Sequence, residues 1–218
     1  MRYKNKILNI TCDGGAATGK STGAKMLAKK FGLAFLSSGL LYRYAAYLIL
    51  KHKPKNEISF IRGKFNNLNN KKLLKIKLHT TKISLHSSII AKQLAIRKIL
   101  KRYQKNFIKI NNGCVLEGRD ASTNILPNSD VKFFFICNLK TAAQRRFMEL
   151  RKNDKNIKLK NVKKALKQRN ILDKNRKHSP LKKHKNAVVV DTGKLNKQAM
   201  LKKMTLHVEK KLKIKYGI

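Results

Sequence analysis

The sequence predicts an α/β fold in which a five-stranded parallel sheet carries helices on both faces. Two observations support this prediction: short apolar runs alternate with segments of helical spacing, and a glycine-rich turn joins the first apolar run to the first helix. Such alternation is typical of parallel sheets, because each parallel strand is reached through a crossover. The 218 residues, of which 42% are hydrophobic, suffice for one domain with a buried core.

The predicted strands are short apolar runs, and the segments between them have the spacing of amphipathic helices. The strands are expected at 6–12, 33–37, 113–117, 131–137 and 187–191. The helices are expected at 20–31, 38–50, 83–103, 141–151, 158–176 and 194–215. Gly32 is placed to end the first helix, as glycine does at the C′ position.

Residues 51–77 interrupt this alternation. They are polar, rich in lysine and asparagine, and contain a proline and a glycine, so we expect a small, weakly ordered insertion. Helical spacing returns from Ile83 to Tyr103. The candidate core positions of that helix are Ile83, Ile90, Leu94 and either Ile99 or Leu100.

The charge balance is extreme, with 53 Lys and Arg against 10 Asp and Glu and a formal net charge of +43. Such a field predicts non-specific binding of polyanions at low salt. The lysines are spread over the whole chain with many Asn and Ile, which are residues favoured by AT-rich codons. A dedicated nucleic-acid-binding protein more often concentrates basic and aromatic residues on one face. We therefore interpret the charge as a compositional bias rather than as the function.

The three cysteines, Cys12, Cys114 and Cys137, lie far apart in the sequence and show no metal-ligand spacing. An odd number gives no disulfide framework, so buried free thiols in a reducing cytosol are expected. No signal-peptide pattern and no long uncharged apolar stretch is found. The sequence thus predicts a cytoplasmic, monomeric protein without a membrane partner.

The segment GGAATGKS (14–21) matches the pattern G-x-x-x-x-G-K-[ST] directly after a predicted strand and directly before a predicted helix. In such loops the glycines let backbone N–H groups surround a phosphate, and the helix N-terminus adds positive charge. Lys20 can reach the β- and γ-phosphates, and Ser21 or Thr22 can place a hydroxyl on Mg²⁺. The predicted nucleotide-binding residues are Gly14, Gly15, Ala16, Ala17, Thr18, Gly19, Lys20, Ser21 and Thr22.

Three later segments carry residues suited to an acceptor that has its own phosphate. SSGLLYR (37–43) begins the second helix, and GRDAST (118–123) follows the third strand, at the edge of the sheet where ligands bind. Arg169, Asp173 and Arg176 recur at i, i+4 and i+7 and so share one helical face. Arginine forks match phosphate oxygens, and carboxylates suit the N–H and O–H groups of a base and a ribose.

Single residues of this set differ in how much they indicate. In so basic a chain, a solvated surface position is favoured for Arg43 or Arg176 taken singly. Asp120 and Asp173 are more informative, because the chain has only 10 acidic residues.

The motifs DGGAATGKST, FLSSGLLYR, EGRDASTNILP, VKFFF, QRR, QRNILDKNRKHSPL and AVVVDTGKL follow one another along the chain. Their ordered series resembles the bacterial cytidylate kinases over nearly the whole chain, except at 51–77. The resemblance implies a P-loop nucleoside monophosphate (NMP) kinase fold and transfer of the γ-phosphate of ATP to CMP or dCMP. It implies a single domain, 1–218, with its core at 1–50 and 83–218, a reduced NMP-binding insertion at about 51–82 and a helical lid at about 148–168.

The resemblance also implies roles for individual residues. Family members bind the acceptor phosphate with residues that match Arg43, Arg119, Arg169 and Arg176, and the sugar hydroxyls with one that matches Asp173. Cytosine is read by residues that match Ser88, Arg97 and Asp120, and Ser38 is expected beside the acceptor. The residues implied in catalysis are Lys20, Arg145 and Arg146. The residues implied at Mg²⁺ are Ser21, Thr22 and Glu117.

The chain departs from the family pattern at Ser37, His79, Glu117 and Ala142, and its insertion is shorter than usual. Two alternatives therefore remain open. One is another P-loop kinase that acts on UMP, dTMP or a small metabolite. The other is a basic RNA-binding protein whose kinase site has decayed, for which we expect salt-dependent RNA binding that persists without Lys20.

Overall fold

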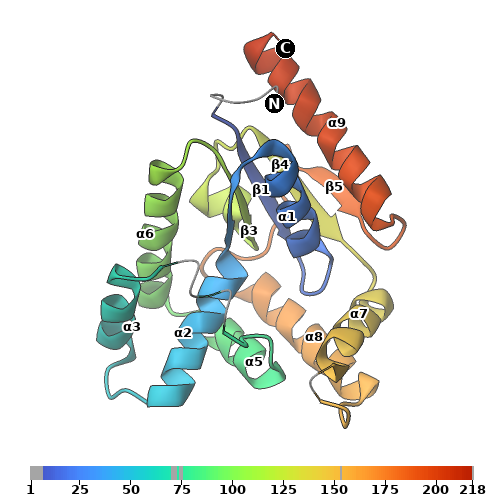
Figure 1. The fold of residues 1–218 in the computed structure, drawn as a ribbon. Helices are drawn as coiled ribbons and strands as arrows, with labels where there is room; N and C mark the ends of the chain where they lie inside the picture. Colours follow the sequence, from blue (N-terminus) through green and yellow to red (C-terminus); the bar gives the residue numbers. More distant parts are fainter. Residues whose placement is uncertain (1–6, 70–72, 74–75, 153, 218) are drawn as a thin grey trace.

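The computed structural model describes residues 7–69, 73, 76–152 and 154–217. Its sheet consists of β1 (Asn9–Gly14), β2 (Ala34–Ser37), β3 (Cys114–Gly118), β4 (Val131–Ile136) and β5 (Val188–Asp191). The strands are all parallel and lie in the order β2-β3-β1-β4-β5 (Figure 1). The structure therefore confirms the predicted five-stranded parallel sheet.

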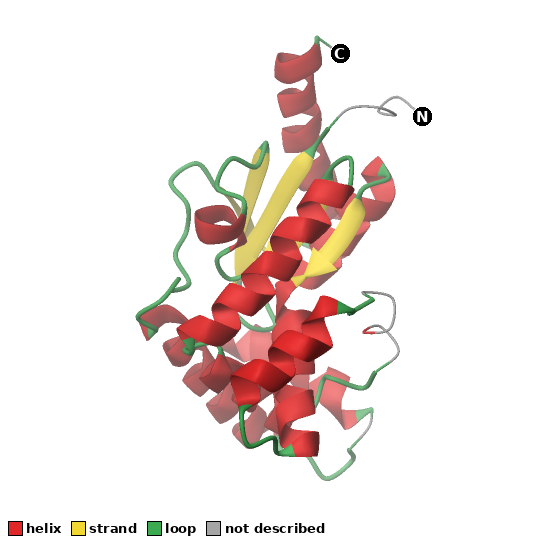
Figure 2. Ribbon diagram, turned by 90° about the vertical axis from the view of Figure 1, so that its left-hand side faces the viewer, coloured by secondary structure: helices red, strands yellow, loops and turns green. Residues whose placement is uncertain are grey.

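Helices cover both faces of this sheet (Figure 2). Because successive side chains of a strand point to opposite faces, Cys114 and Leu116 of β3 enter one core and Val115 enters the other. The first core is shared with α2 (Ser38–His52), α3 (Glu57–Asn66), α5 (Thr81–Ile90) and α6 (Leu94–Ile110). The second is shared with α1 (Lys20–Phe31) and α9 (Lys197–Tyr216). Burial on both faces explains why the strands are continuous apolar runs.

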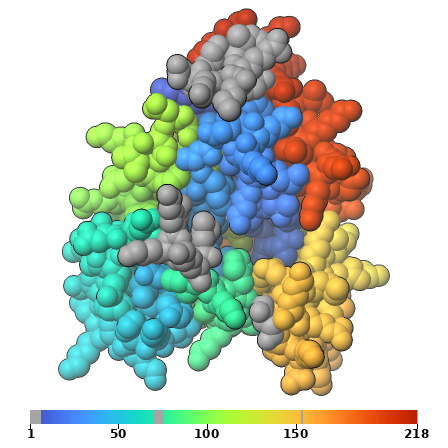
Figure 3. All heavy atoms as spheres, viewed as in Figure 1, coloured from blue at the N-terminus to red at the C-terminus, as the bar shows by residue number. Residues whose placement is uncertain are grey.

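Two more helices, α7 (Leu139–Arg151) and α8 (Leu159–Asn175), pack against each other beyond the end of the sheet. Their apolar residues form a third cluster, which includes Ala16 of the loop after β1. In Figure 3, α5 (green) lies between the helices α2 and α3 and the gold helices α7 and α8, and α5 packs against both α2 and α8.

Side-chain caps explain where several helices begin. Asn56, Thr80, Asn138 and Asn196 each precede a helix and accept a hydrogen bond from the backbone N–H three residues later. These bonds satisfy N–H groups that have no partner within the helix. Gly32 ends α1 with a φ of 64°, as predicted.

The single helix predicted for 83–103 is wrong, because the chain breaks between α5 and α6. The break turns Leu94 to the surface, where it is 46% exposed, whereas Ile90 and Leu100 are buried as expected. The carbonyl of Ala91 in this break accepts a hydrogen bond from Arg97 of α6 at 3.2 Å. A side chain six residues further on thus satisfies a free carbonyl at the end of α5, and no glycine or proline marks the break.

The expectation of a weakly ordered segment at 51–77 is also wrong in part. The segment contains α3, whose Ile61 and Phe65 are buried against the first core. The prediction also covers 70–72 and 74–75, which lie outside the described residues. A polar average composition concealed the two apolar positions that face the core.

Among the described residues, no helix is both long and apolar enough to cross a membrane. The cysteines are free thiols, as predicted. Cys12 and Cys114 are buried, but Cys137 is half-buried at the end of β4.

Candidate active site

The loop between β1 and α1 is shaped by close approach to its neighbours. Gly14 has a φ of 155°, and a Cβ at this position would lie 2.5 Å from the carbonyl oxygen of Phe135 in β4. Gly19 and Ala17 adopt positive φ values of 78° and 58°. The loop then enters α1 at Lys20, so the free N–H groups of the helix N-terminus face the space above the loop. This geometry suits a phosphate group.

A cleft of about 390 Å³ lies at this loop. The loop residues from Ala16 to Thr22 line it, and so does Glu117 of β3. The arginines that line the cleft are Arg43, Arg119, Arg145, Arg146 and Arg169. These come from α2, the end of β3, α7 and α8, so four separate parts of the chain direct cations to one space.

Lys20 lies at the base of the cleft and is only 5% exposed. Its Nζ donates to the carbonyl of Gly15 at 3.0 Å and lies 3.4 Å from Oε1 of Glu117. Burial, followed by the positive charge of Arg119, lowers the pKa of Lys20 to about 7, although Glu117 acts in the opposite direction. An incoming phosphate would add negative charge beside Lys20 and so favour its charged form.

Glu117 is buried between Lys20 and Ser37, whose hydroxyl donates to Oε2 at 2.5 Å. Burial alone would raise the pKa of Glu117, but Lys20 and the bond from Ser37 outweigh it, and the net shift is downward. The carboxylate is therefore ionised and already has two partners.

The arginines that line the cleft outnumber the carboxylates that line it. Burial, followed by the charges of Arg146 and Arg119, lowers the pKa of Arg43 to about 10. Burial, with Arg43 next, also lowers the pKa of Arg169 well below its ordinary value, and the buried Nε of Arg169 has no hydrogen-bond partner in the described structure. This excess of positive charge matches a ligand that carries several negative charges.

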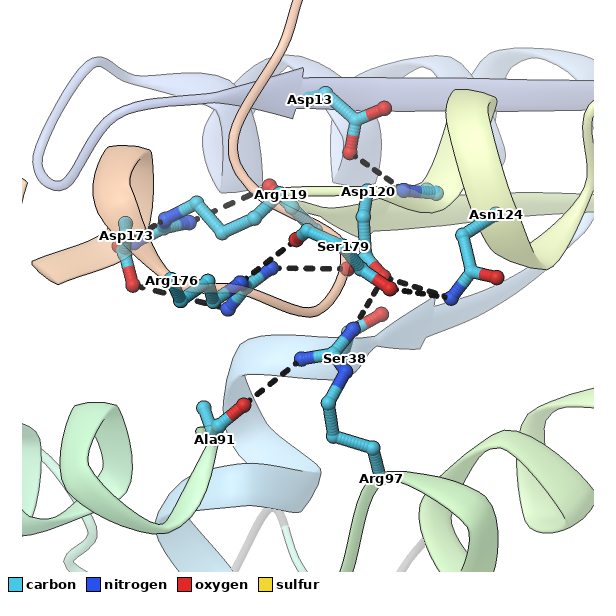
Figure 4. A network of polar contacts seen from close by, with 12 residues as sticks. Asp13, Ser38, Ala91, Arg97, Arg119, Asp120, Asn124, Asp173, Arg176 and Ser179 are labelled. Atoms are coloured by element: carbon cyan, nitrogen blue, oxygen red, sulfur yellow. Dashed lines mark hydrogen bonds and ion pairs between the residues drawn. The ribbon is translucent and has the colours of Figure 1, made fainter. Parts of the chain in front are cut away.

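The structure brings most of the predicted acceptor residues together beside this cleft (Figure 4). Arg119 donates to Asp173 at 2.7 Å, and Arg176 lies 3.9 Å from the same carboxylate. Burial alone would raise the pKa of Asp173, but Arg119 and Arg169 lower it. Asp173 is therefore an ionised acceptor on α8.

Asp120 forms a second carboxylate centre next to the first. Arg97 of α6 donates to its Oδ2, and Arg176 lies 3.5 Å from its Oδ1. Ser88 and Ser38 face the small space beside this network, which measures about 30 Å³ and is far smaller than a nucleotide. The ion pairs of Asp120 and Asp173 thus occupy most of the space on the acceptor side.

Ser38 and Ser88 have local partners. The hydroxyl of Ser38 accepts a hydrogen bond from the buried amide of Gln104 at 2.6 Å. The hydroxyl of Ser88 donates to the carbonyl of Ser84 at 3.4 Å. Gln104 was not among the residues selected from the sequence.

Arg145 and Arg146 are adjacent in α7, but their side chains bond to different partners. Arg145 is exposed and donates to the hydroxyl and the carbonyl of Thr192, at 2.9 Å and 2.7 Å. Arg146 is buried and bonds to the carbonyl of His79 at 2.9 Å and to Glu149 at 2.7 Å. Both residues line the cleft.

Two further residues that hold the site were also missed. Asp13, just before the loop, is fully buried and accepts three hydrogen bonds from Ala121 and Ser122, which begin the π-helical segment η1 (Ala121–Ile125). Burial raises the pKa of Asp13 to about 6, against the effect of those bonds. Asn170 of α8 accepts a hydrogen bond from the N–H of Ala16. A charged residue directly after the predicted strand 6–12 was a signal for Asp13, whereas no feature of the sequence distinguished Asn170.

The residues at the loop fit a magnesium ion that arrives with a nucleotide. Mg²⁺ is usually held by one or two protein oxygens together with phosphates and water, rather than by a cage of side chains. Ser21 and Thr22 line the cleft and offer hydroxyls. In the part of the chain that is described, no three His, Cys, Asp or Glu side chains gather into a metal site.

Comparison with known proteins identifies the family. The model of the cytidylate kinase family matches residues 10–210. The chain belongs to the cytidylate kinase family. A cytidylate kinase of Bartonella tribocorum is 38% identical over 87% of this chain and 89% of its own length. A cytidylate kinase of Listeria welshimeri is 32% identical over 95% and 98% of the two chains.

Membership of the cytidylate kinase family also accounts for the fold. A solved protein of Thermus thermophilus aligns over 95% of this chain and 98% of its own, with a TM-score of 0.52 and 14% identity, which supports the architecture alone. The family match confirms the resemblance drawn from the ordered motifs, and with it a nucleotide-binding transferase. The RNA-binding and other-kinase alternatives are not favoured.

Proposed function

We propose that this member of the cytidylate kinase family transfers the γ-phosphate of ATP to CMP or dCMP. The observation that carries the proposal is the placement of two ionic centres, Asp120 with Arg97 and Asp173 with Arg119, beside the arginine-lined cleft of Lys20. A triphosphate donor and a phosphate-bearing acceptor both require cations, and a base and a ribose require carboxylates.

On the donor side, the loop residues Gly14 to Thr22 hold the phosphates of ATP. Lys20 lies at the end of the loop, where it neutralises charge on the β- and γ-phosphates. Ser21 and Thr22 would hold Mg²⁺, which would supply further charge neutralisation when bound with ATP. Glu117 orients Lys20 and would contribute its carboxylate to the metal site.

On the acceptor side, a phosphate meets the arginines of the cleft, and the nucleoside lies toward Asp120. The proposed phosphate-binding residues are Arg43, Arg119 and Arg169 of the cleft, together with Arg176 beside it. Asp173 accepts from the sugar hydroxyls, and Ser88, Arg97 and Asp120 read the cytosine ring, with Ser38 beside them. Cytosine offers an amine donor next to ring acceptors, which complements a carboxylate next to a guanidinium.

Chemistry at this site needs no strong base, because positioning and charge stabilisation dominate phosphoryl transfer. Arg145 and Arg146 stabilise the transferring group. We propose that the lid, at about 148–168, closes over them and excludes water. We further propose one domain, with the NMP-binding insertion at about 51–82, in a monomeric, cytoplasmic enzyme.

The test is an ADP-release assay with Mg·ATP, in which CMP, dCMP, UMP, AMP and dTMP are offered separately. We expect turnover with CMP and dCMP, and its loss in Lys20→Met. Equal turnover with UMP would contradict the role of Ser88, Arg97 and Asp120 while retaining the donor site. Folded protein that turns over none of the acceptors would contradict the proposal as a whole.

A further inference from the structure

Asp120 has a further set of polar contacts, which involve Asn124 and Lys101. Arg97 and Lys101 are one turn apart on α6, and Asp120 and Asn124 are four residues apart around η1. Arg97 donates to Asp120, and Lys101 donates to Oδ1 of Asn124 at 2.7 Å. The two contacts therefore lie as parallel rungs between the same two segments.

The lysine determines how the amide of Asn124 is oriented. An ammonium group can only donate, so the side-chain oxygen of Asn124 faces Lys101 and its Nδ2 faces the other way. Nδ2 donates to Oδ2 of Asp120 at 3.1 Å and to the hydroxyl of Ser179 at 3.0 Å (Figure 4). The amide thus presents donors to the carboxylate rather than an acceptor.

Ser179 holds the far side of this arrangement. Its φ of 50° is unusual for a residue with a side chain, and such strained positions persist where surrounding contacts enforce them. Its carbonyl accepts from Nε of Arg176 at 2.7 Å, and its hydroxyl meets Asn124. One residue therefore anchors both Arg176 and Asn124, the two side chains that flank Asp120.

As a result, the two carboxylate oxygens of Asp120 differ in how many hydrogen bonds they accept. Arg97 and Asn124 both donate to Oδ2 of Asp120, whereas Oδ1 has only a distant contact with Arg176 at 3.5 Å. An ionised carboxylate has about four acceptor positions, so free capacity remains on Oδ1. A ligand group can use that oxygen only by donating a hydrogen bond. An exocyclic amine can do so, and a ring carbonyl in the same place cannot.

We propose that Asn124, oriented by Lys101, is a specificity-determining positioning residue that makes Asp120 select an amine-bearing pyrimidine over one with a carbonyl. The inference rests on the proposed function, because it concerns the base of the acceptor nucleotide. Asn124 acts through Asp120 and does not itself contact the base.

The test compares CMP with UMP in Asn124→Leu, which keeps a side chain of similar size without the amide. We expect kcat/KM for CMP to fall about tenfold, mostly through KM, with the values for UMP and the KM for ATP unchanged. Lys101→Met, which frees the amide to rotate, should lower the CMP preference in the same direction by about threefold. Asn128→Leu is the matched control, because Asn128 is an exposed asparagine just after η1, and it should leave the preference unchanged.

Binding measured by titration calorimetry gives the same comparison without turnover. An unchanged ratio of CMP to UMP affinity in both Asn124→Leu and Lys101→Met would overturn the inference, and so would equal losses for the two nucleotides. Wild-type protein that binds UMP as tightly as CMP would contradict the proposed function instead.

Discussion

The side-chain oxygen of Asn170 accepts a hydrogen bond from the backbone N–H of Ala16 at 3.1 Å, and so joins α8 to the loop after β1. The contact is close, because a Cβ on Gly15 would lie 3.3 Å from the same oxygen. Arg169 and Asp173, on either side of Asn170 in the sequence, belong to the acceptor region. One helix therefore holds both the donor loop and the acceptor groups.

Replacing Asn170 by alanine removes this connection. One net hydrogen bond contributes about 0.5–1.5 kcal/mol, so we expect the KM for ATP to rise about three- to tenfold while the KM for CMP changes less. Steady-state kinetics, with ATP and CMP varied in turn, measures the two KM values. Gln168→Ala, an exposed position on the same helix, is the control. A larger effect on CMP than on ATP would argue against a role in the donor loop.

We predict that ATP binding is coupled to the uptake of a proton by Lys20. Its pKa is lowered to about 7 in the free protein, so the side chain is mostly neutral at about pH 8 and protonated at about pH 6. Bound phosphates favour the charged form and raise that pKa. We therefore expect an uptake of up to about one proton per ATP at pH 8, which disappears as the pH falls toward 6. Calorimetry in buffers of different ionisation enthalpy measures it, and an equal uptake by Lys20→Met would exclude Lys20 as the source.

Asp13→Asn is expected to destabilise the fold. The variant retains one acceptor oxygen but places an NH₂ group against donors that now bond to the carboxylate. A buried N–H that loses its partner costs about 1–3 kcal/mol, so the free energy of unfolding should fall by about 2 kcal/mol. Urea denaturation followed by circular dichroism tests this value. A variant of wild-type stability would show that the three bonds contribute little.

The net charge predicts weak, salt-dependent binding to nucleic acid. Because the affinity arises from released counterions, it should fall at least tenfold between about 50 mM and about 200 mM salt. Fluorescence anisotropy with a labelled RNA of arbitrary sequence measures this fall, and a second RNA of the same length should behave alike. Marked preference for one sequence would contradict our interpretation of the charge as a compositional bias.

The sheet and the donor loop could be predicted because their signals are local. Buried parallel strands are apolar on both faces, and the loop pattern stands between a strand and a helix whatever else the chain does. Gly32 ended its helix for an equally local reason. The predicted acceptor residues came from the ordered motifs, and the structure places Arg97, Asp120 and Asp173 beside one another.

The remaining features depend on contacts that are distant in the sequence. Arg97 bonds to Asp120 from another helix, and Asn124 beside Asp120 bonds to Lys101 and Ser179, which lie 23 and 55 residues away in the sequence. Nothing about a single asparagine in a basic chain distinguishes a surface amide from one that supports a carboxylate. Such residues become visible only when the neighbouring elements are placed in space.

The central position of β1 has a consequence for synthesis on the ribosome. Its two neighbours are β3 and β4, and Asn9 pairs with Cys114 more than a hundred residues later in the chain. Until β3 has emerged, the first strand to be made has no partner on either side, and unpaired strand edges are prone to aggregate. The earliest strand therefore cannot take its place in the sheet until the whole of α1 to α6 has been synthesised.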